Sequence, residues 1–131
     1  MRLLIDTQAA LWLFNEHEYL PAAVREYLLD EANELYISIA SAWEVAIKHS
    51  LGKLYEFNGG VSRFLSAVNE YPIELITILP RFIATVEELP YVHRDPFDRI
   101  IIATAMCEGM SIVTSDKNIH NYDVKCVLFQ K

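Results

Sequence analysis

Short apolar runs alternate along the chain with longer stretches in which apolar residues recur every three or four positions. A short apolar run is typical of a buried strand, and the longer recurrence is typical of a helix with one packed face. The pattern predicts strands at residues 2–6, 35–40, 74–79, 111–114 and 124–128. It predicts helices at residues 7–14, 20–33, 42–51, 61–71, 81–89 and 95–108. Strands and helices in alternation favour an α/β fold: one parallel sheet of four to five strands with helices on both faces.

Capping residues refine where these helices begin and end. We expect Thr7 and Ser41 to be N-caps, and Pro21 to occupy the first position of its helix. Asp95 stands directly before a proline at the start of the sixth helix, which predicts an N-cap role for it. Gly109 is expected to end that same helix, and Gly52 to end the helix at residues 42–51.

Length and composition indicate one globular domain. The 131 residues suit a single domain spanning residues 1–131, and a hydrophobic content of 53% excludes a disordered chain. No apolar run approaches the ~20 residues of a membrane-spanning helix, and none follows Met1 that would suit a signal peptide. Cys107 and Cys126 lie far apart without metal-binding spacing, so we expect free thiols and a cytoplasmic protein.

The charge distribution narrows the possible functions. The formal net charge of -7 opposes a protein that coats nucleic acid with a basic surface. Most of the excess negative charge lies in the first third of the chain. The apolar share exceeds the ~45–50% typical of soluble domains, which predicts a surface that is covered by a subunit or a partner.

Four acidic residues stand where a parallel sheet would collect them. Asp6 and Asp116 each follow a predicted strand, and Glu44 and Asp98 each lie early in a predicted helix. Because strands of a parallel sheet end, and the following helices begin, at the same edge, we expect these side chains to share one rim. They are called the acidic quartet below.

Carboxylates gathered at one rim repel each other and need a cation or protons to coexist. Oxygen donors without His or Cys favour a hard cation such as Mg²⁺, with Mn²⁺ as a second choice. A metal ion held in this way can activate water and stabilise charge at phosphorus, so the chemistry indicated is phosphodiester hydrolysis.

Each acid also has a purely structural interpretation. Asp6 can cap the following helix, and Glu44 can pair with Lys48 one helical turn away. The negative charge of Asp98 can interact favourably with the helix dipole in the first helical turn, and Asp116 can stabilise a turn. Only their coincidence at one rim favours a functional site.

Several residues beside the acids keep two interpretations. His93, Arg94 and Arg99 are either ordinary loop and helix-surface charges or phosphate contacts beside a metal site. Trp12 and Trp43 fall within helical apolar stripes, so they are expected in the core or at an interface and not as platforms for base stacking.

Four strings in order resemble a known family. The strings LLIDTQAALW, SIASAWEVAIKHSLGKL, HRDPFDRIIIATA and IVTSD are similar to motifs of the PIN-domain nucleases, in particular of the VapC-like toxins. The resemblance runs from Leu3 to Asp116 and beyond. It implies a single PIN domain in which Asp6 and Asp98 are the principal Mg²⁺ ligands. Glu44 and Asp116 would complete the cluster, partly through waters.

The resemblance also implies roles outside the acids. Thr7 and Ser115 would orient carboxylates and waters. The implied activity is Mg²⁺-dependent endoribonuclease cleavage of RNA by a toxin, which is expected to be a homodimer. A small antitoxin would cover the acidic groove with its C-terminal segment and insert a basic side chain.

The first predicted helix suits an added hydrophobic segment of such a partner, because it and the loop after it carry Leu11, Trp12, Phe14 and Tyr19.

Two hypotheses of another class remain. One is a receiver-like signalling module, which would share the sheet order and the clustered acids. It would also need an Asp after a middle strand, whereas the strand at residues 74–79 ends at Pro80. The other is a PIN-like module that binds without cleaving, which the sequence leaves open.

Overall fold

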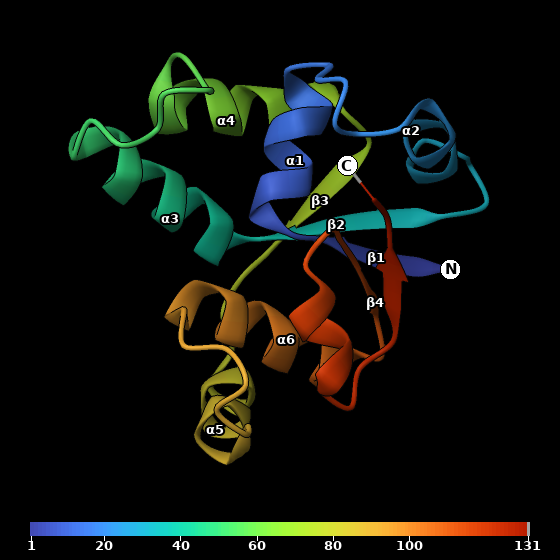
Figure 1. Ribbon diagram of the computed structural model, residues 1–131, viewed down its shortest axis with the longest axis vertical. Helices are drawn as coiled ribbons and strands as arrows, with labels where there is room; N and C mark the ends of the chain where they lie inside the picture. The colour runs from blue at the N-terminus through green and yellow to red at the C-terminus, as the bar shows by residue number, and fades with distance from the viewer. Residues whose placement is uncertain (131) are drawn as a thin grey trace.

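A parallel β-sheet runs through the middle of the molecule, whose computed structural model describes residues 1–130 (Figure 1). Within those residues the strands are β1 (Arg2–Ile5), β2 (Glu34–Ser38), β3 (Ile73–Ile76), β4 (Ser111–Thr114) and β5 (Cys126–Leu128). Their order in the sheet is β3-β2-β1-β4-β5, and all neighbouring strands are parallel. The predicted parallel sheet is therefore confirmed.

The sheet order corrects one expectation. Receiver domains have the order 2-1-3-4-5, in which the third strand lies beside the first. In this chain β1 lies between β2 and β4, and β3 is at an edge. The expected likeness in sheet order to a receiver domain is therefore wrong.

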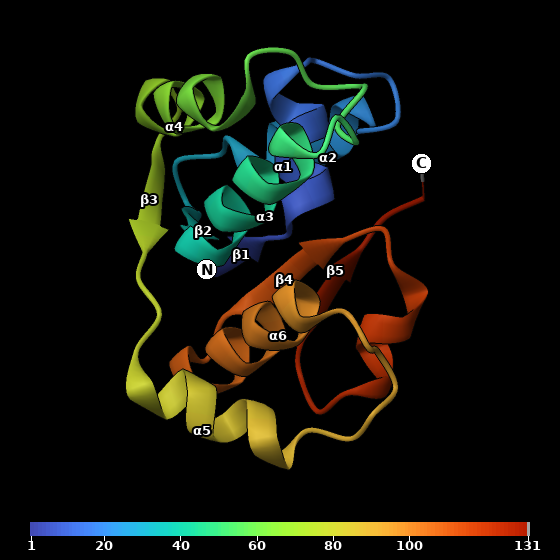
Figure 2. The same cartoon turned by 90° about the vertical axis from the view of Figure 1, so that its left-hand side faces the viewer.

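Helices cover both faces of the sheet, as predicted. They are α1 (Thr7–Phe14), α2 (Ala22–Leu28), α3 (Ile39–Ser50), α4 (Gly60–Glu70), α5 (Pro80–Glu88) and α6 (Pro96–Glu108), with a short 3-10 helix η1 (Lys117–Asn121). Figures 1 and 2 show α1 to α4 on one face, and α6 on the other with α5 packed beside it. None of the described helices is long and apolar enough to cross a bilayer.

The central strand shows why the sequence folds in this way. Leu3, Leu4 and Ile5 are completely buried, because β1 has a helical layer on each side. Leu3 and Ile5 join the core beneath α1 to α4, whereas Leu4 joins the core beneath α6. A continuous apolar run is what a strand buried on both faces requires.

Two helix starts differ from the prediction. Asp6, and not Thr7, caps α1, because its carboxylate accepts a hydrogen bond from the Ala9 amide at 2.8 Å. Ser38, and not Ser41, caps α3, which therefore begins three residues earlier than expected. The hydroxyl of Thr7 instead donates to that of Ser41 at 2.8 Å and ties α1 to α3.

Other helix ends follow the sequence signals in part. Pro21 occupies the N-cap position of α2 and not its first helical position, and α2 ends at Leu28, well before residue 33. Asp95 caps α6 as predicted, accepting from the Phe97 amide at 2.8 Å, and Gly109 ends it in a left-handed conformation. The two cysteines are free thiols, as expected, although both are only partly buried.

Candidate active site

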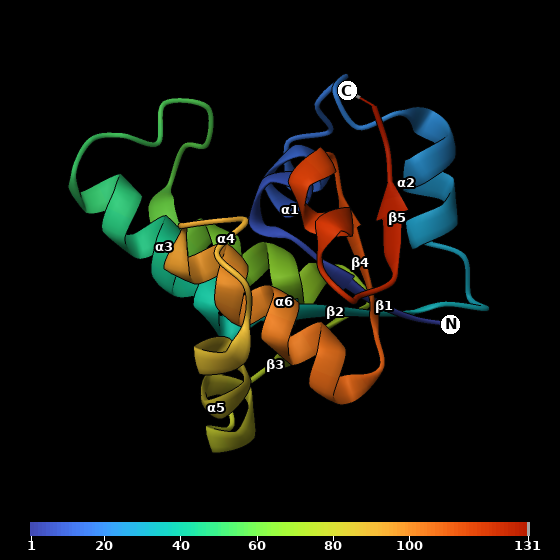
Figure 3. The same ribbon diagram turned by 60° about the horizontal axis from the view of Figure 1, so that its bottom comes forward.

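The site lies where the chain changes direction across the sheet. From β1 the chain crosses to β2 on one side, and from β3 it crosses to β4 on the other. Such a switch point leaves a crevice beyond the carboxyl ends of the two central strands, here β1 and β4. Figure 3 shows α1, α3 and α6 around this end of the sheet.

A cleft of about 300 Å³ occupies this crevice, and the whole acidic quartet faces it. Its lining residues are Asp6, Thr7, Gln8, Leu11, Trp12, Glu44, Val45, Lys48, Leu54, Asp95, Asp98, Ser115 and Asp116. The structure thus brings together four acids that are separated by up to 110 positions in the sequence, and adds Asp95 as a fifth carboxylate.

Asp6 is the most enclosed aspartate of the group, with 7% of its surface exposed. Burial raises the pKa of its carboxyl to about 6, and the nearby charges of Asp116 and Glu44 act in the same direction. Hydrogen bonds from the Thr114 hydroxyl and the Ala9 amide partly offset this rise in pKa. Asp6 is therefore both a helix cap and a destabilised carboxylate in the cleft.

Glu44 is buried, with 5% of its surface exposed, in the second turn of α3. Its Oε2 accepts from Lys48 Nζ at 2.6 Å, so the predicted pairing along the helix exists. Its Oε1 is buried and has no hydrogen-bond partner among the described residues. A buried carboxylate oxygen without a partner is costly, which indicates that something outside the protein chain binds there.

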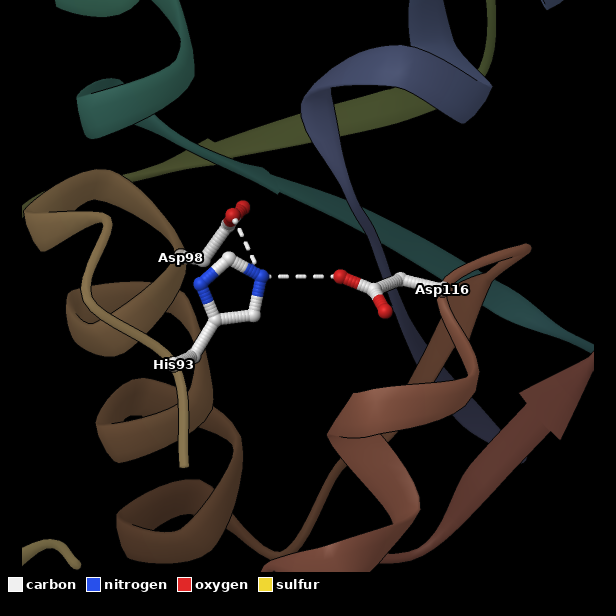
Figure 4. A group of neighbouring side chains, drawn as sticks. All are labelled: His93, Asp98 and Asp116. Carbon is white, nitrogen blue, oxygen red and sulfur yellow. Dashed lines mark hydrogen bonds and ion pairs between the residues drawn. The ribbon is translucent and has the colours of Figure 1, made fainter. Parts of the chain in front are cut away.

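Asp98 and Asp116 approach each other from opposite sides of a histidine. His93 Nε2 lies 3.2 Å from Asp98 Oδ2 and 2.8 Å from Asp116 Oδ2 (Figure 4). Burial raises the pKa of Asp98 to about 7, with further contributions from the charges of Asp95, Glu44 and Asp6, while His93 lowers it. Asp116 also caps η1, because its Oδ1 accepts from the Asn118 amide at 2.9 Å.

The remaining candidates occupy different positions. Ser115 lines the cleft, and Arg94 is exposed in the loop before α6. Arg99 matches neither of its two interpretations, because its guanidinium is buried and donates to the carbonyl oxygens of Val86, Leu89, Pro90 and His93. This arrangement fixes the loop that carries His93 onto α6.

The sequence did not predict the hydrogen bonds of the Thr114 hydroxyl or the burial of the apolar residues in α1. Thr114 accepts a hydrogen bond from the Asp116 amide at 2.9 Å and also donates to Asp6, so it joins two acids. It lies in the string IVTSD, but no spacing rule reveals where its hydroxyl points. Phe14 is packed against Phe64 and Tyr71 in the core, and Leu11 and Trp12 are also buried, although both line the cleft. Of the four apolar residues that were expected to contact a partner, Tyr19 is the exposed one.

The donor set fits a hard divalent cation. Every quartet member offers carboxylate oxygens, Glu44 keeps one oxygen without a partner, and two aspartates have raised pKa values. Mg²⁺ and Mn²⁺ prefer oxygen ligands of this kind, and a cation would offset both the cost of burial and the repulsion that raise those pKa values.

Comparison with known proteins agrees with the fold and the motif order. A family profile described as PIN domain matches residues 3–125. The chain belongs to the PIN domain family. It is 28% identical over 121 residues to Ribonuclease VapC22 from Mycobacterium tuberculosis, which covers 92% of this chain and 91% of that protein. The likeness of this PIN domain to VapC proteins, expected from four strings, is thus confirmed.

Solved structures share the PIN fold at lower identity. The VapBC2 complex from Rickettsia felis, bound to a DNA fragment from its promoter, matches 99% of this chain and 100% of the compared chain, with a TM-score of 0.74 at 18% identity. DNA-bound VapBC from Salmonella typhimurium matches 96% of each chain, with a TM-score of 0.67 at 15% identity.

The raised pKa values predict how stability depends on pH in metal-free protein. The folded state binds the protons of Asp6 and Asp98 more tightly than the unfolded chain does, so the unfolding free energy should fall as pH rises from about 4 to about 7. Asp98→Asn should raise the unfolding free energy at pH 8 by on the order of 2 kcal/mol and leave it nearly unchanged at pH 4. Urea denaturation in EDTA at both pH values measures this, and a variant less stable at pH 8 would contradict it.

Proposed function

We propose that this PIN domain is a metal-dependent endoribonuclease and the toxin of a toxin–antitoxin pair. The observation that carries the proposal is the cleft itself, in which four carboxylates from four separate segments meet and one buried glutamate oxygen lacks a protein partner. A site that served only to cap helices would not concentrate this much negative charge.

The proposed ligands are those that the resemblance to PIN-domain nucleases implies, and all four line the cleft. Asp6 and Asp98 would be the principal ligands of Mg²⁺, with Mn²⁺ as a substitute. Glu44 and Asp116 would complete the cluster, partly through waters. When bound, the metal ion would lower the pKa of a coordinated water and stabilise negative charge on the scissile phosphate.

The protein's own groups prepare the carboxylates for this task. The amides of Ala9 and Asn118 each hold one oxygen of an aspartate, and His93 Nε2 lies 2.8 Å from the second oxygen of Asp116. Lys48 holds one oxygen of Glu44 in the same way. Carboxylates that are already held in place lose less conformational entropy when a cation binds, and they can accept a proton from an attacking water in a defined direction.

Two side chains at the rim of the cleft are proposed to contact phosphate groups of the RNA substrate. Arg94 is exposed in the loop before α6, and Ser115 lines the cleft beside Asp116. Both can donate hydrogen bonds to phosphate oxygens, which would position the strand without reading its bases. Thr7, whose hydroxyl is engaged with Ser41, would act by holding α1 and α3 in register.

An antitoxin is the proposed protein partner. A second hollow of about 300 Å³ adjoins the acidic cleft along α1, and the two share Leu11, Trp12, Lys48 and other lining residues. A peptide laid along this surface would have apolar contacts at one end and the carboxylates at the other. The VapBC neighbours are themselves complexes, which supports a partner of this kind.

A homodimer is the proposed assembly. An apolar hollow of about 240 Å³ lies where α3, α5 and α6 meet, and it is lined by Trp43, Ile78, Ile83, Val86, Pro96, Phe97 and Ile100. Trp43 and Ile83 are each 59% exposed. A second copy of the chain would remove these large side chains from water, as the surplus of apolar residues predicts.

Two substitutions in α6 and its cap separate nuclease chemistry from structure. Asp98→Asn should abolish RNA cleavage, because the variant loses a principal ligand while its helix stays intact. Asp95→Ala should cost about 1 kcal/mol of stability through the lost N-cap and keep measurable cleavage. Cleavage of a labelled RNA in Mg²⁺, with EDTA as the blank, tests both. Full cleavage by a folded Asp98→Asn protein would contradict the role of Asp98 as a ligand, whereas a folded wild-type protein that cleaves no RNA in Mg²⁺ would favour a non-cleaving binding module.

The partner should inhibit by occupying the metal site. A cationic side chain of the antitoxin would compete with Mg²⁺ for Asp6 and Asp98, while contacts near Leu11 and Trp12 would supply most of the affinity. Replacing the inserted Arg or Lys with Ala should restore partial cleavage without dissociating the complex. Raising Mg²⁺ should modestly weaken the unaltered complex. RNase assays of the co-purified pair across Mg²⁺ concentrations measure both effects. A substituted complex that cleaves no RNA at any Mg²⁺ concentration would show that the inserted side chain does not inhibit by occupying the metal site.

A further inference from the structure

We propose that His93 clamps Asp98 to Asp116 as a hydrogen-bond donor through its Nε2–H and stays outside the ligand set of the metal. The inference rests on the proposed metal-dependent function, because it concerns the same carboxylates. His93 would thus be a positioning residue that decides which oxygens face the cleft.

The contacts of the His93 ring are compatible with two roles, a hydrogen-bond donor or a metal ligand. Nε2 lies between two carboxylate oxygens, at 2.8 Å from Asp116 and 3.2 Å from Asp98 (Figure 4). One ligand atom from each of the three residues falls within 4.8 Å of the others, which by distance alone would also permit a metal ion with a nitrogen ligand. The two roles differ in where the ring proton lies.

The second ring nitrogen decides between the two roles. Nδ1 of His93 faces the backbone N–H of Asp95, at 3.4 Å between the nitrogen atoms. An N–H group donates to a lone pair, so Nδ1 must be unprotonated and the ring proton must be on Nε2. A histidine that binds a metal through Nε2 has the opposite arrangement, with Nδ1–H donating to an acceptor. Nε2 of His93 therefore has no lone pair to offer a cation.

The loop that carries His93 is held from both sides. The backbone N–H of His93 donates to the hydroxyl of Tyr122 at 2.7 Å, and its carbonyl oxygen accepts from the buried guanidinium of Arg99 at 3.3 Å. These contacts fix the ring between α6 and the turn that follows β4. Moving the ring proton from Nε2 to Nδ1, which would leave a lone pair at Nε2, would bring two donors together at Nδ1.

The clamp has a consequence for the metal. With His93 excluded, the ligand set contains only oxygen atoms, which suit hard cations such as Mg²⁺ and Mn²⁺, whereas a nitrogen ligand would add affinity for Zn²⁺. The same N–H offsets part of the repulsion between two carboxylates that belong to different segments. His93 therefore contributes to metal affinity by orientation and not by coordination.

Nitrogen-15 NMR of histidine-labelled protein at pH 8 reads the proton position directly. The chain has four histidines, and the His93 signals are those that disappear in His93→Gln. We expect the Nε2–H tautomer in EDTA and the same tautomer after Mg²⁺ is added. A proton on Nδ1, protons on both nitrogens, or an Nε2 signal typical of a metal-bound nitrogen would overturn the proposal. This readout does not depend on RNA cleavage, so it separates failure of the clamp from failure of the proposed function.

A matched pair of variants tests the positioning role. The amide nitrogen of Gln can reach the position of Nε2, whereas that of Asn reaches only the position of Nδ1. We expect His93→Gln to bind Mg²⁺ within about threefold of wild type and His93→Asn to lose roughly tenfold or more, as for other groups that orient ligands. Calorimetry should give the same ratio of Mg²⁺ affinity to Zn²⁺ affinity in both variants. Equal Mg²⁺ affinities in the two variants, or a selective loss of Zn²⁺ binding, would overturn the proposal.

Discussion

Repulsion between carboxylates that converge on one end of a parallel sheet is the constraint on which the rest of the site depends. Burial raises the pKa of Asp6 to about 6 and that of Asp98 to about 7, and neighbouring acids add to both shifts. Binding of the proposed cation would recover the free energy stored in this way. The fold would then be less stable without the metal than with it.

The fold supplies the means to hold these charges in place. The central strand is buried on both faces, so the position of Asp6 at its end is fixed by packing on two sides. Amide donors at the starts of α1 and η1 restrain Asp6 and Asp116, and Lys48 restrains Glu44. These three carboxylates thus each have an oxygen bound within the protein, and His93 Nε2 lies between the second oxygen of Asp116 and an oxygen of Asp98. The position of Asp98 therefore depends on a loop residue, His93, whose backbone is held by Arg99 and Tyr122.

The sequence predicts the sheet, both helical layers and the meeting of the four acids, because these follow from periodicity and from the geometry of parallel strands. It fails where side-chain direction decides the outcome. The hydroxyls of Thr7 and Ser41 could cap helices by type, but Thr7 is the first residue of α1 and Ser41 the third residue of α3, and the two hydroxyls bond to one another. Arg99 has the residue type and the spacing of a phosphate contact, yet its guanidinium is buried among four carbonyl oxygens of its own chain. Residue type and spacing do not specify which way a long side chain turns.

The central claim is that the acidic quartet forms one metal site, and calorimetric titration of Mn²⁺ into metal-free protein tests it most directly. Wild type should bind Mn²⁺ in the cleft, and Asp6→Asn should weaken that binding strongly, by at least the ~10–100-fold that loss of a group orienting a ligand causes. Glu87→Gln is the matched control, because it removes one negative charge from the exposed surface of α5, away from the cleft residues. The account predicts wild-type affinity for the Glu87→Gln control. Equal Mn²⁺ affinities in wild type and Asp6→Asn would contradict the account.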